Sequence, residues 1–295
     1  MVERYLKAGS LVEAMQFLNH YEGRARVVAG ATDLWVGIKN HNTKAEAFVD
    51  ITGVDELKTV EISKDYIRIG SGVTFHELEK NVQIQKNLRA LQEAARWMGS
   101  PQIRRMATLG GNLVSAQPAA DGMVAMSALD VAVEMVGPDG TKRRTLESCY
   151  KTFGESMIDS SREIVTAFVI PLHNQAHSYF GRFHLREANA LPVINCAVGA
   201  WMKEDGSWES RYILAPLGYH PARLRAMEDA LAGGLLEERE LYDTIEKHIE
   251  ELTFRTSLVR GSAEFRKQIA VQLMHEQIIR LWYNHEQEGE SDAKH

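Results

Sequence analysis

Two short glycine-containing segments are the residues whose types and spacing could do chemistry in this sequence. Residues 27–34 read Val-Val-Ala-Gly-Ala-Thr-Asp-Leu, and residues 108–112 read Thr-Leu-Gly-Gly-Asn. Glycine lets backbone amides approach an anion closely, and the flanking Thr and Asn side chains add hydrogen-bond donors. Two such loops facing each other could hold a pyrophosphate from both sides. A turn at Gly30 or a bulge at Gly110–Gly111 explains the same glycines equally well.

The other residue types that commonly do chemistry form no such arrangement. No G-x-x-x-x-G-K-[ST] motif occurs, and Gly70-Ser71-Gly72 lacks the third glycine of a dinucleotide fingerprint, so we expect no Rossmann crevice. His173 and His177 have the spacing of metal ligands on a helix, but Pro171 predicts that they lie in a loop, and we expect no metal site. No Ser/His/Asp set and no pair of acids has suitable order or spacing. We therefore predict no catalytic residue in this chain.

The cysteine content limits the redox centres that this chain can hold. Its 2 cysteines are Cys149 and Cys196. Two thiols cannot by themselves ligate a four-cysteine zinc ion or an iron–sulfur cluster. We expect both to be free, buried thiols, so any iron–sulfur chemistry would belong to another chain.

Composition is that of an ordinary globular protein. Among 295 residues, 34 Lys and Arg stand against 40 Asp and Glu, a formal net charge of −6 without a long basic block. Such a chain is a poor candidate for nucleic-acid binding. No apolar run approaches the ~20 residues that a membrane span needs, and residues 1–7 lack the apolar core of a signal peptide. We expect a cytoplasmic protein without a membrane segment.

Capping and periodicity predict the elements that must position the two glycine segments. Ser10 with Glu13, and Thr74 with Glu77, form capping boxes, in which the Glu side chain bonds back to the amide of the Ser or Thr. Strands are predicted at 27–29, 47–51, 66–70, 131–136, 163–170, 193–202 and 212–217, with a turn at Gly206. Helices are predicted at 10–20, from 74, and at 88–98, 222–232, 236–251 and 262–284, followed by a frayed polar tail over 286–295.

Several motifs, in this order along the chain, resemble the FAD-binding subunit of molybdenum hydroxylases. This family includes the medium chains of xanthine dehydrogenase, nicotinate dehydrogenase and carbon monoxide dehydrogenase. The motifs are Ala-Gly-Ala-Thr-Asp at 29–33, Gly-Ser-Pro-Gln-Ile-Arg at 99–104, Ala-Thr-Leu-Gly-Gly-Asn at 107–112, Pro-Ala-Ala-Asp at 118–121 and Arg-Gly-Ser-Ala-Glu-Phe-Arg at 260–266. Together they span nearly the whole chain.

The resemblance implies a set of FAD-binding residues. The first loop would bind the pyrophosphate through Val27, Val28, Ala29, Gly30, Ala31, Thr32, Asp33 and Leu34, and the second through Thr108, Leu109, Gly110, Gly111 and Asn112. Asp121 would accept a hydrogen bond from a hydroxyl of the FAD sugar portion, although it could instead be a helix cap. Gly99 would lie where the backbone passes the flavin, and Val165 on the strand beside it.

Two positions depart from the family's pattern. Arg182 stands where a lysine usually points toward the cofactor, and a planar guanidinium is not equivalent to a point charge. Ala31 replaces the commoner second glycine, and its methyl group is tolerated there if φ is negative. Arg104 and Arg105 could help to bind an anion or could lie at the surface.

The fold that the resemblance implies is of the α+β class. It is the two-subdomain FAD-binding fold of the PCMH (vanillyl-alcohol-oxidase-like) type, followed by a C-terminal domain with a small antiparallel sheet and helices. The predicted segments are an N-terminal FAD-binding subdomain over 1–57, a second one over 58–175 and the C-terminal domain over 176–295.

The function that the resemblance implies is that of an electron-transfer oxidoreductase subunit. It would bind FAD noncovalently, take electrons from the two [2Fe-2S] clusters of a small partner subunit and pass them to NAD+ or another acceptor. A large molybdopterin-binding subunit would oxidise the substrate, and the assembly would be a dimer of heterotrimers.

Two other functions stay open on the sequence alone. A stand-alone FAD-dependent reductase of the UDP-N-acetylenolpyruvoylglucosamine reductase type has similar FAD loops, but residues 99–104 and 260–266 fit it poorly. A nucleotide-binding module without turnover is the second alternative. Bound flavin would argue against the module, and copurification with two other chains would favour the subunit over the reductase.

Overall fold

The computed structural model describes residues 3–40, 45–186, 191–232 and 236–292, and they form two compact units. Unit 1 comprises Met1–Leu78, Met98–Gln117 and Val131–Pro171, and unit 2 comprises Glu79–Trp97, Pro118–Asp130 and Leu172–His295. The helices within 79–97 and 118–130 thus share a unit with the C-terminal strands. The three segments predicted above, divided near 57 and 175, stay a prediction.

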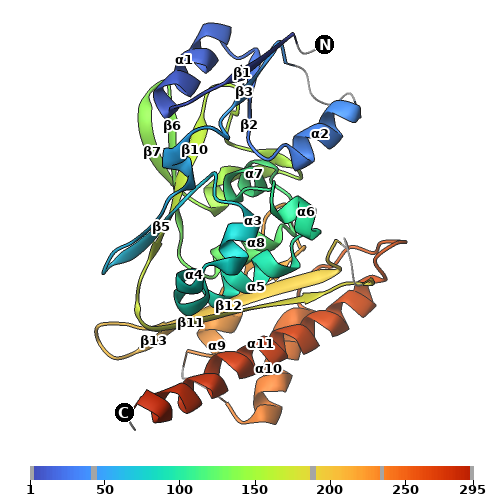
Figure 1. Cartoon of the computed structure of the whole chain (residues 1–295). Helices are drawn as coiled ribbons and strands as arrows, with labels where there is room; N and C mark the ends of the chain where they lie inside the picture. Colours follow the sequence, from blue (N-terminus) through green and yellow to red (C-terminus); the bar gives the residue numbers. More distant parts are fainter. Residues whose placement is uncertain (1–2, 41–44, 187–190, 233–235, 293–295) are drawn as a thin grey trace. The chain divides into compact units, whose positions relative to one another are not determined.

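Unit 1 opens with a small parallel sheet that is covered by a helix (Figure 1). Strands β1 (Arg4–Lys7), β2 (Ala25–Val28) and β3 (Ala47–Asp50) lie in the order β1-β3-β2. Helix α1 (Leu11–Tyr21) packs Ala14 and Leu18 into the core of this sheet. Ser10 caps α1 as predicted, because its Oγ accepts a hydrogen bond from the Glu13 amide at 3.2 Å. The predicted return bond is wrong by one residue, since the Glu13 carboxylate accepts from the amide of Gly9 at 2.7 Å.

The second sheet of unit 1 has five antiparallel strands in the order β4-β5-β10-β6-β7. They are β4 (Val60–Ile62), β5 (Tyr66–Gly70), β6 (Ala132–Gly137), β7 (Gly140–Thr145) and β10 (Ile164–Pro171). The central strand, β10, is almost wholly buried, which explains why its sequence is apolar apart from Thr166. Short elements complete the unit: η1 (Asp55–Lys58), α6 (Pro101–Arg104), α7 (Leu109–Val114), η2 (Glu147–Cys149), β8 (Tyr150–Thr152) and β9 (Glu155–Ser156).

Helix α3 (Phe75–Lys80) carries the chain from unit 1 into unit 2. The predicted capping box at its start is present: the Thr74 amide donates to the Glu77 carboxylate at 2.7 Å, and the Glu77 amide donates to the Thr74 hydroxyl at 3.2 Å. Two further helices, α4 (Val82–Asn87) and α5 (Arg89–Trp97), follow in unit 2. Helix α5 therefore lies within one residue at each end of the predicted range 88–98.

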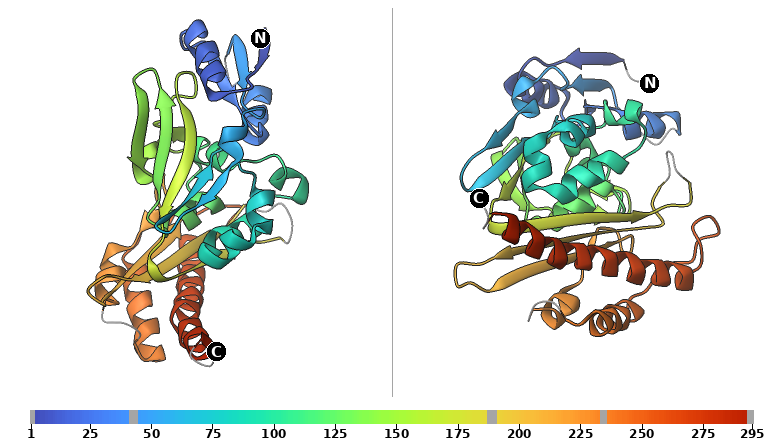
Figure 2. Two further views of the ribbon diagram at one scale, coloured as in Figure 1. Left: turned by 60° about the vertical axis from the view of Figure 1, so that its left-hand side comes forward. Right: turned by 60° about the horizontal axis from the view of Figure 1, so that its bottom comes forward.

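Unit 2 is built on an antiparallel sheet with helices on both faces (Figure 2). Its strands, in sheet order, are β11 (Asn174–Phe183), β12 (Ile194–Met202), β13 (Trp208–Ala215) and β14 (Ala222–Arg223). A side chain at Gly181 would meet Gln277 of helix α11 (Ala263–Asp292), whereas one at Gly199 would meet the Ala128 carbonyl at the end of α8 (Asp121–Ser127). Successive strand residues face opposite sides, so α5 and α8 cover one face and α11 the other.

Helices α9 (Arg225–Ala230) and α10 (Glu238–Glu250) complete the apolar core beside α11. Two predictions about this region need correction. Residues 222–223 pair with β13 as a short strand, so the helix predicted from 222 begins only at Arg225. The tail predicted to fray is helical as far as Asp292, while 293–295 lie outside the described residues. Among the described residues, no helix combines the length and the apolar character that crossing a bilayer requires.

Candidate functional site

The first glycine segment is a sharp turn that joins β2 to helix α2 (Thr32–Lys39) in unit 1. Strand β2 ends at Val28, and α2 begins only four residues later. Ala31 has a φ of +56° in the left-handed region, so the negative φ under which its methyl group would be tolerated is not found. A Cβ in this conformation is disfavoured by roughly 1–2 kcal/mol, which explains why glycine suits the position better. The turn carries local strain at the residue that precedes α2.

Helix α2 begins without a side-chain cap among the described residues. Its first-turn amides, on Thr32, Asp33 and Leu34, have no intrahelical partners, because such bonds begin with the Trp35 amide, which donates to the Ala31 carbonyl at 2.9 Å. Uncapped amides at the positive end of a helix are a common binding site for phosphate groups. The start of α2 can therefore accept an anion.

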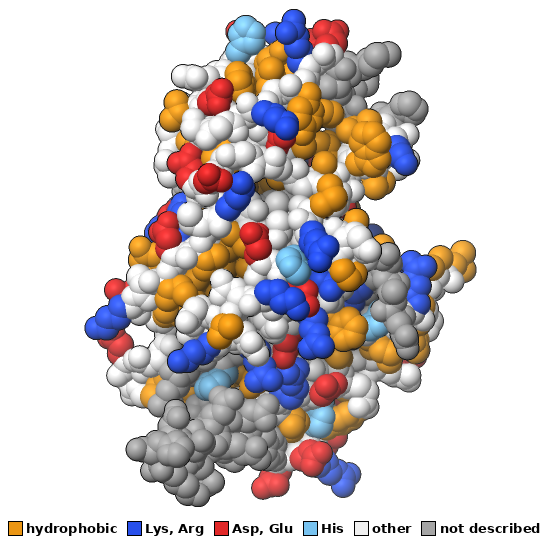
Figure 3. Space-filling view, viewed as in Figure 1, with side chains coloured by type: hydrophobic (Ala, Val, Ile, Leu, Met, Phe, Trp, Pro, Cys, Tyr) orange, Lys and Arg blue, Asp and Glu red, His pale blue; other side chains and the backbone are white. Residues whose placement is uncertain are grey.

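Helix α2 buries none of its own residues, although it is rich in apolar side chains. Trp35 is 58% exposed and Val36 55%. Figure 3 shows hydrophobic side chains on the surface where α2 lies in Figure 1. This helix adds little to the core of unit 1, in contrast to α1, so its role is better sought at its amino end.

The turn before α2 lies directly against the chain that leads into the second segment. A Cβ at Gly30 would overlap the carbonyl oxygen of Met106 and would lie 3.1 Å from the Cα of Ala107. Only glycine fits this approach, because the obstructing atoms belong to backbone. The structure thus brings Gly30 of the first segment against Met106 and Ala107, directly before the second segment, as two segments that act on one ligand require.

The second glycine segment is helical, which corrects the loop predicted for residues 108–112. Thr108 caps α7, and its hydroxyl accepts from the Gly111 amide at 3.1 Å. The amides of Leu109 and Gly110 donate to the carbonyls of Val73 and Ser71, at 3.0 and 2.8 Å. These amides already have partners inside unit 1. They are not equivalent to the uncapped amides of α2.

The two glycines of α7 serve different purposes. Gly110 is buried, and a Cβ there would lie 2.7 Å from the Cβ of Ser71, so packing requires glycine. Gly111 is exposed, and only the Thr108 hydroxyl lies within 4 Å of a Cβ added to it. The exposed backbone at Gly111 leaves room for a ligand beside α7.

Two buried polar atoms in the same part of unit 1 have no hydrogen-bond partner among the described residues. They are Oδ1 of Asn112, on α7, and Oγ of Ser71, which packs on Gly110. Buried polar atoms are nearly always hydrogen-bonded, so each of these two can take a partner such as ordered water or a bound ligand. The uncapped amides of α2 suit the phosphate groups of a ligand such as FAD, and Oδ1 of Asn112, an acceptor, suits a donor group on it.

Gly99 and Val165, the other predicted residues of unit 1, lie at distinct places. Gly99, with a φ of +52°, forms the turn before α6, and the Arg104 guanidinium donates to its carbonyl at 3.3 Å. Arg104 therefore holds this turn, while Arg105 is exposed at the carboxyl end of α6. Val165 is buried on β10, where the pairing with β6 shifts register before Ala167.

The predicted residues of unit 2, Asp121 and Arg182, form a buried ion pair. Asp121 is the first residue of α8 and is 6% exposed, and the side chain of Arg182, on β11, is 4% exposed. The Arg182 guanidinium donates to Oδ2 of Asp121 and, at 3.1 Å, to the carbonyl oxygen of Trp97 at the end of α5. Asp121 is thus a first-turn residue of α8, and Ala120, without a side-chain bond, occupies the cap.

Asn195, on β12, completes this pair and was not found from the sequence. Its Nδ2 donates to Oδ1 of Asp121 at 2.8 Å. Burial raises the pKa of Asp121 to about 6, even though the charge of Arg182 and the Asn195 hydrogen bond both act to lower it. The available signal was a polar residue inside an apolar strand, Val-Ile-Asn-Cys-Ala-Val.

His177 lies within β11 rather than in the predicted loop, while His173 precedes the strand and stacks on Trp201 with ring centroids 4.6 Å apart. Within the described ranges, no group of three or more His, Cys, Asp or Glu side chains is arranged to hold a metal ion. Cys149 and Cys196 are free and buried as predicted, and burial raises the pKa of both thiols, that of Cys149 to about 11.

Comparison with known proteins agrees with this geometry. Residues 1–173 match the FAD binding domain in molybdopterin dehydrogenase, and residues 179–281 match the CO dehydrogenase flavoprotein C-terminal domain. The nicotinate dehydrogenase FAD-subunit of Eubacterium barkeri is 28% identical over 266 residues, which are 88% of this chain and 89% of that protein. The carbon monoxide dehydrogenase medium chain of Afipia carboxidovorans is 26% identical and covers 90% and 92% of the two chains.

The fold is also that of a solved structure, quinoline 2-oxidoreductase from Pseudomonas putida 86. The TM-score is 0.87 at 21% identity, with 97% of this chain and 98% of that chain aligned. The α+β fold and the family that the motifs predict are both confirmed. The chain belongs to the family of FAD-binding medium subunits of molybdenum hydroxylases, and as such it is an oxidoreductase component that binds FAD.

Proposed function

We propose that this chain is the electron-transfer subunit of a three-subunit molybdenum hydroxylase. It takes electrons from the [2Fe-2S] clusters of a small partner subunit and passes them to NAD+ or another acceptor, while a large molybdopterin-binding subunit oxidises the substrate. Bound FAD supplies a redox centre that exchanges electrons singly or in pairs, which suits a link between one-electron clusters and a two-electron acceptor. The chain itself supplies binding and electrostatics.

The observation that carries this proposal is the uncapped start of α2 beside the Gly30–Met106 approach. In this proposal the amides of Thr32, Asp33 and Leu34 bind the FAD pyrophosphate. Gly30 brings the turn against the chain before α7. The side chain of Asn112 donates a hydrogen bond to FAD through Nδ2 or accepts one from it through Oδ1. The remaining residues of 27–34 and 108–112 shape the two segments.

Four further residues have roles in the proposal. Gly99 and Val165 lie beside the flavin, and the carboxylate of Asp121 accepts a hydrogen bond from a hydroxyl of the FAD sugar portion. Arg182 acts on the cofactor through Asp121, because its guanidinium is directed to that carboxylate. Arg182, which stands where the family usually has a lysine, thus acts as a planar donor within an ion pair and not as a point charge directed at the cofactor.

Electrons must enter from another chain in this proposal. Both cysteines are buried, and among the described residues no three His, Cys, Asp or Glu side chains are grouped to hold a metal ion. Two cysteines cannot by themselves ligate an iron–sulfur cluster. The dimer of heterotrimers and the cytoplasmic location stay predictions of the sequence.

An anaerobic mixing experiment tests the proposed function. The FAD-loaded chain is mixed with xanthine, nicotinate or an aldehyde, and flavin absorbance is followed. We expect no bleaching by the chain alone, and rapid bleaching once the purified iron–sulfur and molybdopterin subunits are added. NADH with an artificial dye tests the acceptor side independently. Bleaching of the lone chain by substrate would place the substrate site in this chain and overturn the proposal.

A further inference from the structure

Arg182 and Asn195 are paired directly across two strands of unit 2. In the antiparallel register of β11 and β12, Arg182 lies opposite Asn195. Side chains of opposed residues point to the same face of a sheet, and here that face is covered by α5 and α8. Both side chains therefore reach the first turn of α8 together.

Each of these two side chains binds one oxygen of the Asp121 carboxylate. The Arg182 guanidinium donates to Oδ2, and Nδ2 of Asn195 donates to Oδ1 at 2.8 Å. Nδ2 of Asn195 also donates to the carbonyl oxygen of Ala119 at 3.1 Å. These two bonds use both N–H groups of the amide, so the orientation of Asn195 is fixed relative to Asp121 and to the residues before α8.

Asn195 offsets the cost of its own burial through the two bonds that it donates. It is fully buried, and its Oδ1 has no partner among the described residues. Leaving a buried acceptor unpaired is costly, but an apolar residue at 195 would take this donor from both Oδ1 of Asp121 and the carbonyl oxygen of Ala119. The Nδ2 group therefore acts on the Asp121 carboxylate as well as on the residues before α8.

We propose that Asn195 is a positioning residue of the FAD site, which fixes the Asp121 carboxylate and keeps it ionised for a hydroxyl of the cofactor. This inference rests on the proposed function, because it assumes that Asp121 meets the FAD sugar portion. Arg182 alone would bind only Oδ2 of Asp121. The carboxylate could then rotate, and its Oδ1 could take up a proton. Asn195 occupies that second oxygen with a donor.

The surroundings of Asp121 make ionisation sensitive to this one bond. Burial raises its pKa to about 6, Arg182 is the charged group whose field lowers it, and Asn195 is the neutral donor that adds to this effect. Other charged groups on the elements packed against α8 have partners of their own: Glu93 of α5 with Arg89 and Arg280, and Arg211 of β13 with Asp130. Without the Asn195 donor, Asp121 would stay protonated up to a pH closer to neutral.

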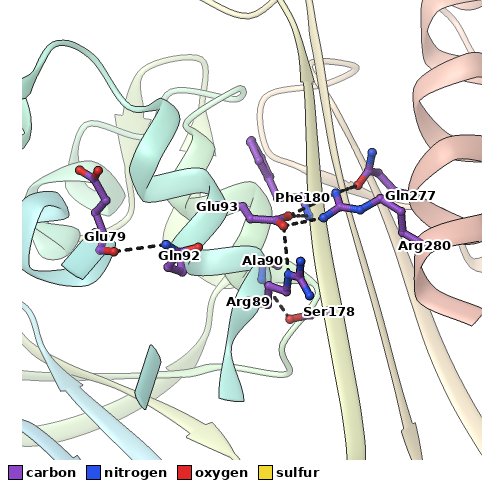
Figure 4. Close-up of polar contacts among 9 residues, drawn as sticks. All are labelled: Glu79, Arg89, Ala90, Gln92, Glu93, Ser178, Phe180, Gln277 and Arg280. Atoms are coloured by element: carbon purple, nitrogen blue, oxygen red, sulfur yellow. Dashed lines mark hydrogen bonds and ion pairs between the residues drawn. The ribbon is translucent and has the colours of Figure 1, made fainter. Parts of the chain in front are cut away.

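A separate set of contacts joins α5 to β11 and supplies the control (Figure 4). The Ala90 amide donates to the Ser178 hydroxyl at 3.2 Å, and the Phe180 amide donates to the Glu93 carboxylate at 3.0 Å. Ser178 lies on the same strand face as Arg182, four residues away, and does not bond to Asp121. Its removal weakens the packing of α5 on β11 without taking a donor from the carboxylate.

The test compares Asn195→Leu with Ser178→Ala and Asp121→Asn in the full chain. The dissociation constant of FAD is measured from pH 5 to 8, and the carboxylic acid band of Asp121 is titrated by infrared spectroscopy. For Asn195→Leu we expect about tenfold weaker FAD binding at pH 7, as for one hydrogen bond to a charged group, and a titration moved to higher pH. For Ser178→Ala we expect lower thermal stability with both readouts unchanged.

The outcomes separate this inference from the proposed function. If Asp121→Asn binds FAD as the wild type does, Asp121 has no cofactor role, and the proposal for Asn195 falls with it while the electron-transfer role stands. If Asp121→Asn weakens FAD binding but Asn195→Leu leaves affinity and titration unchanged, only the positioning role is overturned. If Asn195→Leu fails to fold, Asn195→Asp, which is equal in size, is used in its place. We again expect Asp121 to titrate at a higher pH than in the wild type. Failure of both variants to fold would make Asn195 a structural residue and refute the proposal.

Discussion

Gly30 lies so close to Met106 that no other residue type fits between the turn before α2 and the chain before α7. The contact is with a backbone carbonyl, which cannot rotate away as a side chain can. It also means that the uncapped amides of α2 and the capped start of α7 are parts of one local structure in unit 1. The geometry of this contact determines where an anion bound by α2 would lie.

Replacing Gly30 therefore disturbs the proposed pyrophosphate site directly. In Gly30→Ala the new methyl group must displace the Met106 backbone, and we expect at least about tenfold weaker FAD binding and a lower melting temperature. Isothermal titration and thermal denaturation measure the two effects. Gly218→Ala is the matched control, because nothing lies within 4 Å of its added Cβ. Equal FAD affinity in both variants would separate the Gly30 contact from cofactor binding.

Ala31 offers a stabilising change beside the same turn. Its φ of +56° is costly for any residue with a Cβ, so we expect Ala31→Gly to raise the free energy of unfolding by about 1 kcal/mol. Urea denaturation of the FAD-free chain measures this. Ala29→Gly in the same turn, where φ is not positive, should instead destabilise, since glycine adds freedom to the unfolded chain and removes a methyl group that packs against the core. The same sign for both variants would contradict the strain at Ala31.

Gly111 tests the second segment. Its backbone is exposed, and an added side chain meets only the Thr108 hydroxyl, at 3.0 Å. We expect Gly111→Val to keep the fold, as judged by circular dichroism, and to reduce the fraction of FAD that copurifies, because the side chain occupies the space beside α7. Gly218→Val controls for the residue type. Full flavin occupancy in Gly111→Val would remove α7 from the site.

The pH dependence of stability gives a test of the buried ion pair without cofactor. Because the pKa of Asp121 rises from 3.8 to about 6 on folding, the folded chain binds a proton that the unfolded chain releases between these values. The free energy of unfolding contributed by this group therefore falls as pH rises from about 4 to 6, by up to about 3 kcal/mol. Asp121→Asn should flatten this part of a urea-denaturation pH profile. An unchanged slope would place the titration elsewhere.

Sequence patterns predicted elements well where one local signal dominates. The alternation in Tyr66–Gly70 gave β5 with both ends correct, and the apolar run at 193–202 gave β12 within one residue. The capping residues at Ser10 and Thr74 also placed two helix starts correctly. The capping bonds join residues that are close in the sequence, and the two strands are recognisable from their own patterns even though β5 pairs with the distant β10.

The misses depend on partners that are distant in the sequence. Glycines at 110 and 111 lower helix propensity, yet α7 forms because Ser71 and Val73 accept its first amides. The left-handed φ of Ala31 lies beside the close approach of Gly30 to Met106, a contact that no local pattern encodes. Asn195 becomes a candidate only when the register of β11 with β12 sets it opposite Arg182. Side-chain types are visible in the sequence, whereas pairing across strands is not.

The interleaving of the two units along the chain limits how the protein can be synthesised and divided. The chain passes from one unit to the other after Leu78, Trp97, Gln117, Asp130 and Pro171. A fragment that stops at 171 would hold all of unit 1 together with α5 and α8, whose apolar residues, among them Leu91 and Met123, would lack the sheet that buries them. On the ribosome these helices emerge before β11 to β13 exist. A nascent chain of this length therefore exposes the apolar faces of α5 and α8 to solvent until the sheet of unit 2 has been made.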